Sequence, residues 1–329
     1  MRKLFSLATA FTLSAFSLMA QETTEEFKPS GKPIVTIFSN AHSTFVDETN
    51  TSAFEIQRAQ FGYEYLYTKN FSGTIIFDVC DPNSGELEMD AFLRAAALTY
   101  KTDKLLVNFG MIGLYEFKYQ EKQWGYRYIM KSFQDEYKFG STADLGLTIE
   151  YKFADFISAD VAIVNGEGYK KVQSDDTYKG AMGITVTPLK NLDFRAYYSL
   201  MKTDTSQQSF AFFAGYKSER FRVGGEYNIQ KNHDLINNQD YSGISMYSSV
   251  SISKKISIFG RFDHLTSTNK LNEDGDTWNY KKNGEAYIIG FEYAPIKGVK
   301  FSPNFRGWKP ADDTKGFISS IYLNCEIKF

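Results

Sequence analysis

The 329-residue sequence has few of the residues that build catalytic and metal sites, with three histidines and two cysteines. His42, His233 and His264 fall near the ends of three separate hairpins in the pattern described below. A hydrolase needs a nucleophile, a base and an orienting group within hydrogen-bond reach, and no such set can be assembled. The sequence also has no Cys/His cluster and no phosphate-cradling glycine loop. We therefore expect no enzyme, no metal site and no cofactor, and the histidines are interpreted as rim residues.

Long apolar runs are also missing after the N-terminus, and none approaches the roughly 18 residues that a membrane helix needs. The N-terminus has the pattern of a secretory signal, with Arg2 and Lys3, an apolar stretch over residues 4–19 and a cleavage site after Ala20. Residues 1–20 are thus predicted to be a signal peptide. Residues 21–33 are predicted to form a short periplasmic segment, too short for a plug domain.

Neither sign of charge dominates, since 37 basic residues face 39 acidic ones and the basic residues are spread evenly. This balance argues against a nucleic-acid partner. Proline is scarce, whereas phenylalanine and tyrosine are abundant at 29 and 22 residues, and the mean hydropathy is −0.36. Membrane barrels have such compositions, because only the lipid-facing half of each strand is apolar.

From Ile34 onward, segments of about ten residues alternate between apolar and polar positions, the period of a strand with one lipid face and one water face. The last thirteen residues, 317–329, show this clearly and end on Phe329. Seven short turns and eight longer loops join 16 such segments, with 14 as the alternative if one weak hairpin is misread. The sequence therefore predicts one antiparallel transmembrane β-barrel over residues 34–329. Its short turns and both ends are expected on the periplasmic side, and residues 317–329 are expected to pair with residues 34–46.

Two positions conflict with the alternation. Arg94 shares the apolar face of Phe92, Ala96 and Leu98, and an arginine near the bilayer midplane costs roughly 2–4 kcal/mol. We expect Arg94 to lie near the rim or the register to shift there. Pro303 cannot donate to the ladder of a closed barrel, and it is predicted to mark a bulge.

The two cysteines are predicted to be free thiols. Alternation places Cys80 on the lumen face and Cys325 on the lipid face, three strands apart in a closed barrel. That separation is about 14 Å, whereas a disulfide needs Cα atoms within about 7 Å.

Several strand-and-turn stretches resemble the phosphate-selective porin O and P family of outer-membrane channels. They are RAQFGYEYLYTKNFSGTIIFDV (residues 58–79), LLVNFGMIGLYEF (105–117), ADLGLTIEYKF (143–153), VNGEGY (164–169) and IFGRFDHL (258–265). The resemblance implies a 16-stranded channel in the outer membrane of a Gram-negative bacterium, commonly a homotrimer, with a third loop folded into the pore. The chain departs from the family at Ala143, where arginine is common, so phosphate selectivity is not carried over.

The third long loop, residues 115–139, is the predicted constriction. It holds nine aromatic residues, which either anchor the loop against the wall or stack on solutes. Its constriction candidates are Lys118, Lys122, Trp124, Arg127 and Lys131. The candidates on the lumen wall carry both signs of charge, which favours salt bridges across the wall over a local anion site. They are Arg58, Arg222, Arg261, Glu226 and Asp263.

The sequence thus predicts a porin for passive diffusion of small hydrophilic solutes or ions. The alternative is a plugged or structural barrel whose loops bind a partner protein or a surface ligand. Expected partners are outer-membrane lipid, the permeating solutes, two further copies of the chain and an accessory outer-membrane protein.

Overall fold

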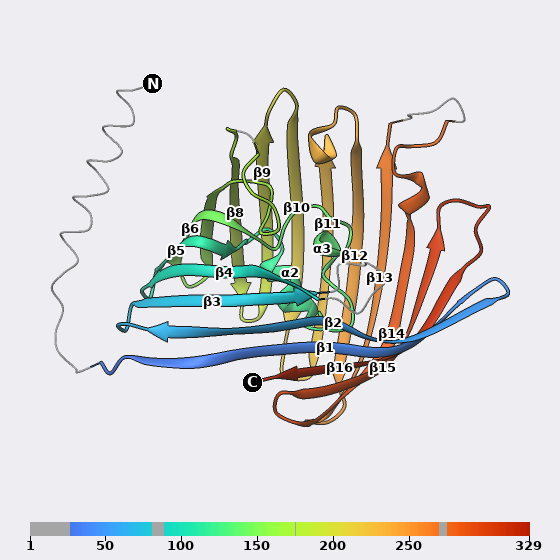
Figure 1. The fold of residues 1–329 in the computed structure, drawn as a ribbon, viewed down its shortest axis with the longest axis horizontal. Helices are drawn as coiled ribbons and strands as arrows, with labels where there is room; N and C mark the ends of the chain where they lie inside the picture. Colours follow the sequence, from blue (N-terminus) through green and yellow to red (C-terminus); the bar gives the residue numbers. More distant parts are fainter. Residues whose placement is uncertain (1–26, 81–88, 175, 270–274) are drawn as a thin grey trace.

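The computed structural model describes residues 27–80, 89–174, 176–269 and 275–329. These residues form a closed barrel of 16 antiparallel strands in which each strand pairs with its neighbours in the sequence (Figure 1). The predicted fold and strand count are confirmed. The strands are β1 (Ser30–Val46), β2 (Thr49–Leu66), β3 (Phe71–Cys80), β4 (Asp90–Lys101), β5 (Leu105–Gly113), β6 (Ala143–Ala154), β7 (Ile157–Val164), β8 (Lys179–Leu189), β9 (Leu192–Lys202), β10 (Ser206–Lys217), β11 (Phe221–Lys231), β12 (Asp240–Ser251), β13 (Ile256–Thr268), β14 (Gly284–Ile296), β15 (Val299–Pro310) and β16 (Ile318–Lys328).

The alternation of the sequence becomes an apolar exterior and a polar lumen. Phe109 and Ile163 are 65% and 61% exposed on the outside, whereas Thr148, Ser245 and Asn324 are fully buried inside. A closed barrel satisfies every backbone group through its ladders, so its outer face can lie against lipid. Within the described residues, no helix is both long and apolar enough to cross a bilayer.

Strand β16 closes the barrel against β1, as predicted. The pairing runs from Thr36 opposite Lys328 to Phe45 opposite Ser319, and Val35 and Phe329 exchange backbone hydrogen bonds of 2.9 and 3.1 Å. However, β1 begins at Ser30 and not at Ile34, so the end of the predicted periplasmic segment is already part of the barrel. The predicted signal peptide lies outside the described residues.

A bulge in β4 resolves the conflict at Arg94. Ile76 of β3 pairs with Ala95 while the next residue, Phe77, pairs with Leu93, so Arg94 is the extra residue. Its side chain turns inward, where Nη2 donates to the Thr142 carbonyl at 3.0 Å. The predicted register shift is confirmed, and it removes an arginine from the lipid face.

The predicted bulge at Pro303 is wrong. Gly290 pairs with Asn304 and Tyr293 with Phe301, which is one continuous register on both sides of the proline. On its other edge Pro303 pairs with Leu323. The missing N–H therefore interrupts the ladder locally without displacing a strand.

All seven short connections lie at one end of the barrel, which we call the turn end; the opposite end is the loop end. The first loop-end connection is shorter than the loop predicted near residues 47–52, because β2 starts at Thr49 and leaves only residues 47–48 between β1 and β2. The β1–β2 hairpin consequently extends past its neighbours (Figure 1). The second of the eight predicted longer loops, at residues 81–88, falls outside the described part of the chain. Cys80 and Cys325 are both free, as predicted.

Candidate functional site

Loop 3, residues 114–142 between β5 and β6, folds into the lumen and carries α2 (Lys118–Trp124) and α3 (Phe133–Glu136). Two further short helical turns, η1 (His233–Leu235) and η2 (Tyr280–Lys282), lie in loop-end connections. Burial of the loop 3 aromatics favours wall anchors over solute-stacking surfaces, because only Tyr119 and Tyr137 of the nine keep appreciable exposure. The other seven are at most 4% exposed: Tyr115, Phe117, Trp124, Tyr126, Tyr128, Phe133 and Phe139.

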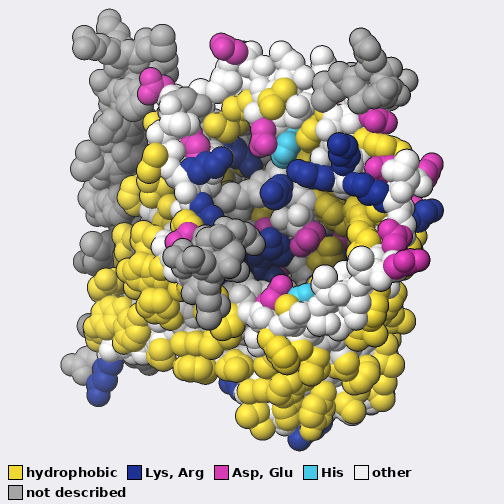
Figure 2. Space-filling view, turned by 45° about the vertical axis from the view of Figure 1, so that its right-hand side comes forward, with side chains coloured by type: hydrophobic (Ala, Val, Ile, Leu, Met, Phe, Trp, Pro, Cys, Tyr) yellow, Lys and Arg dark blue, Asp and Glu magenta, His cyan; other side chains and the backbone are white. Residues whose placement is uncertain are grey.

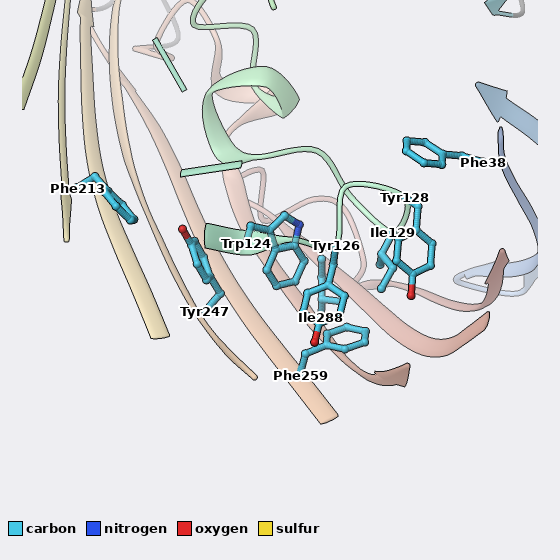
Figure 3. Close-up of a cluster of buried hydrophobic side chains, with 9 residues drawn as sticks. All are labelled: Phe38, Trp124, Tyr126, Tyr128, Ile129, Phe213, Tyr247, Phe259 and Ile288. Carbon is cyan, nitrogen blue, oxygen red and sulfur yellow. The ribbon is translucent and has the colours of Figure 1, made fainter. Parts of the chain in front are cut away.

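Trp124 is the centre of this packing (Figure 3). Its ring centroid lies 5.4 Å from that of Tyr247 and 6.0 Å from that of Phe259, and its indole N–H donates to the Met130 carbonyl at 2.8 Å. The side chain is 1% exposed. Trp124 was predicted to line the constriction, and this placement corrects that prediction, because a side chain with so little exposure anchors the loop and cannot contact a solute.

Helix α2 is fixed near the turn end. The Gln123 side-chain amide donates to the carbonyls of Tyr216 and Val223 at 2.7 and 2.8 Å, and these two residues pair directly above the β10–β11 turn. Arg222 donates to the Trp124 carbonyl at 2.8 Å, at the C-terminus of the helix where a cation is favoured. Gly125 ends the helix at φ 72°, a conformation that favours glycine.

The return half of loop 3 is fixed to the wall by Arg261. This guanidinium donates to both carboxylate oxygens of Asp263 at 2.8 and 2.7 Å and to the Lys131 carbonyl at 2.6 Å. Glu226 is 5% exposed beside them and accepts from Asn228 at 3.0 Å. Four of the five predicted wall charges therefore lie behind loop 3. Arg261 and Asp263 do pair, but within the single strand β13 and not across the wall as predicted.

Arg58 is the one predicted wall charge that borders open lumen. It lies on β2 and donates to Asp78 of β3 at 2.9 Å. Arg222 and Arg261, on β11 and β13, are engaged with loop 3 backbone. The structure therefore does not bring these three arginines together as one anion site.

Loop 3 reaches the far wall through Tyr128. Its hydroxyl donates to Glu292 of β14 at 2.8 Å, and its carbonyl accepts from Asn324 of β16 at 3.0 Å. Burial and the neighbouring Glu292 raise the pKa of Tyr128, so the hydroxyl stays protonated and donates. Phe38 of β1 packs on the ring with centroids 6.4 Å apart. The loop thus spans the lumen and is fixed on both sides.

The space that loop 3 leaves open is a cavity of about 850 Å³ facing the loop end. Figure 2 shows the hollow, with basic and acidic side chains around it and apolar side chains over the exterior below. Of the constriction candidates, Arg127 and Lys131 line this cavity, whereas Lys118 and Lys122 are exposed on α2 and do not border it. Eight basic residues line the cavity against five acidic ones. The basic set is Arg58, Arg127, Lys131, Lys138, Lys170, Lys171, Lys179 and Arg306, and the acidic set is Asp78, Asp135, Glu136, Glu167 and Asp234.

Some of these charges are neutralised by partners. Arg127 forms ion pairs with Glu121 and Asp135 inside loop 3. Arg306 has no carboxylate within ion-pair distance among the described residues; it donates to the amide oxygens of Asn304 and Asn324. Among the same residues, no group of His, Cys, Asp and Glu is placed to hold a metal ion.

Comparisons with known proteins bear on the fold. No family model matches the chain, and no curated protein matches it in sequence. Solved structures do match: the outer-membrane channel DcaP of Acinetobacter baumannii, with TM-score 0.66 and 11% identity, covers 93% of this chain and 99% of its own. OprB of Pseudomonas putida matches with TM-score 0.68 and 9% identity, and the match covers 91% of this chain and 94% of OprB. The anion-selective porin of Comamonas acidovorans matches with TM-score 0.65 and 9% identity, and the match covers 92% of this chain and 100% of that porin.

At these identities the likeness concerns the fold, which is that of outer-membrane porins. Membership of the phosphate-selective family stays a prediction.

Proposed function

We propose that this protein is a porin of the Gram-negative outer membrane that lets small hydrophilic solutes diffuse through its lumen. The observation that carries the proposal is the cavity of about 850 Å³ beside loop 3, inside a closed barrel whose outer face is apolar. Solutes would pass between the wall of β1–β3 and the exposed edge of loop 3. Arg127 and Lys131 would then be in contact with them.

The lining favours anions over cations. Basic residues outnumber acidic ones at the cavity, and Lys131 and Arg306 have no carboxylate partner among the described residues. Charges in a narrow, partly dehydrated passage act on permeating ions more strongly than charges in bulk water. The excess is small, so the proposal is a weak anion preference without a dedicated solute.

Planar-bilayer recording of the purified protein tests the channel. We expect discrete conductance steps and, in a KCl gradient, a reversal potential displaced toward that of chloride. Silence from a barrel that shows the heat-dependent mobility of folded outer-membrane proteins would overturn the proposal.

A plugged barrel that binds a partner is the second candidate, and the dense aromatic packing of loop 3 favours it. Seven buried rings are more than a mobile filter needs. The same recording decides between the two, because a plugged barrel gives no steps. An accessory outer-membrane protein, if bound, would copurify in mild detergent.

Assembly as a homotrimer is part of the proposal. It rests on the family resemblance and on the trimer form in which OmpT of Vibrio cholerae, another structural match, was solved. Chemical cross-linking in native membranes would give a three-copy band, and a band no larger than one copy would refute the trimer.

A further inference from the structure

Loop 4, residues 165–178 between β7 and β8, also folds inward, although nothing in its length predicts this. Its first residues lie across the neighbouring strand. The buried Asp144 carboxylate of β6 accepts from the N–H groups of Gly166 and Gly168 at 2.7 and 3.2 Å, and the Tyr169 N–H donates to the Ala143 carbonyl at 3.0 Å. The loop is therefore tied to the root of loop 3.

From there loop 4 reaches β3 and β4, four and three strands away from β7. The Tyr169 hydroxyl lies 3.3 Å from the Asp78 carboxylate, on the same oxygen that accepts from Arg58. Burial and the nearby Asp78 raise the pKa of Tyr169, so the hydroxyl is protonated and donates. The Arg94 guanidinium lies over the Tyr169 ring, 5.3 Å from its centroid.

Lys170 makes the second contact with the far wall. Its ammonium lies 3.1 Å from the Cys80 sulfur and 4.2 Å from the Phe92 ring centroid. Residues 166–171 all border the cavity.

The inward course of loop 4 also depends on glycine. Gly166 and Gly168 have φ of 114° and 83°, and a Cβ at Gly168 would lie 2.5 Å from the Ser141 hydroxyl.

We propose that residues 166–171 of loop 4 are a second constriction element, latched across the loop-end mouth by Tyr169 and Lys170. The proposal rests on the proposed porin function and adds to it a second loop that narrows the path. Tyr169 is a positioning residue: it holds the loop on β3 and β4 and covers Arg94. Release of the latch widens the mouth and uncovers both Arg94 and Cys80.

Cys80 offers a readout that needs no conductance. In a Cys325→Ser background Cys80 is the single thiol, and its rate of reaction with a neutral maleimide reports whether Lys170 covers it. We expect Tyr169→Ala to raise this rate about tenfold, the effect of losing contacts worth about 1.4 kcal/mol. Tyr169→Phe keeps the ring over Arg94 and loses only the hydroxyl contact, so its rate falls in between.

Tyr178→Ala is the matched control, because Tyr178 is in the same loop but is 62% exposed. Single-channel conductance should rise in Tyr169→Ala and stay unchanged in Tyr178→Ala. Equal maleimide rates in the two variants would overturn the latch. A faster rate with unchanged conductance would overturn the constriction role.

Absence of conductance in every variant would instead refute the porin function and leave the maleimide result to decide where loop 4 lies. If Tyr169→Ala does not fold, Tyr169→Phe carries the same test with a smaller change in volume.

Discussion

The Lys179 ammonium lies 2.6 Å from the Glu116 carboxylate, and the two side chains are 6% and 1% exposed. This pair joins the start of loop 3 to β8. Removing one partner of a buried ion pair leaves an uncompensated charge, which typically costs about 3–5 kcal/mol. We therefore expect Glu116→Gln to lower the free energy of unfolding by about 3 kcal/mol, measured by urea denaturation of the refolded protein in lipid.

The matched control is Asp155→Asn, which breaks the exposed pair of Asp155 with Lys152. Both side chains of that pair are solvated, so no measurable change is expected. Equal effects of the two substitutions would show that the Lys179–Glu116 contact does not hold loop 3. A double variant, Glu116→Leu with Lys179→Met, should recover part of the loss because no buried charge is left unpaired.

Trp124 anchors loop 3, so Trp124→Ala should loosen it. Removing a fully buried tryptophan costs about 3–5 kcal/mol when the cavity does not collapse. Part of that cost appears as detachment of the loop, and we expect larger and noisier conductance steps. Trp124→Phe should be intermediate. Phe156→Ala, in an exposed turn between β6 and β7, is the control, and a Trp124→Ala channel identical to it would argue against the anchor.

The barrel was predictable because one physical rule acts on every strand. Successive residues of a strand between lipid and water point to opposite faces, with a period of two. Errors in assigning single segments average out over 16 strands. Arg94 shows the limit of that rule. A bulge inserts one extra residue, so the residues on one side of it point to the opposite face from the one that the alternation predicts. The only signal of this shift in the sequence was the energetic cost of an arginine that faces lipid.

The site was less predictable than the barrel because it depends on where the loops pack against the inner wall. The alternation correctly places the side chains of Arg222 and Arg261 on the lumen face. It does not show that loop 3 covers both side chains, or that they donate hydrogen bonds to the backbone carbonyls of loop 3. Loop 4 carries a local signal in Gly166 and Gly168, which mark a special backbone. Its contact with Asp78 joins residues 91 positions apart, a distance over which the sequence gives no guide.

The His233 ring packs against Tyr241 and Trp278 at the loop end, with centroids 4.7 and 5.3 Å away. Burial lowers the pKa of His233, an effect that the neighbouring Asp234 opposes. The unfolded chain therefore takes up this proton first, and the stabilising contribution of the neutral ring is lost as the pH falls below about 6.5. Tryptophan fluorescence should show a transition in that range that His233→Gln abolishes. A transition of equal size in the variant would assign it to another group.

The Lys131 ammonium is the simplest test of how charge sets ion preference, because it is exposed at the cavity and only its backbone is held by Arg261. Lys131→Gln removes one positive charge from the path without touching an ion pair. At 0.1 M salt the Debye length is about 10 Å, so a passing ion feels this charge only locally. We expect the anion-to-cation permeability ratio to fall about two- to threefold.

Lys297→Gln is the matched control, because it makes the same chemical change in the exposed β14–β15 turn, away from the cavity. Reversal potentials in a KCl gradient measure both variants. Equal shifts would mean that overall charge, and not the lining of the cavity, sets the selectivity.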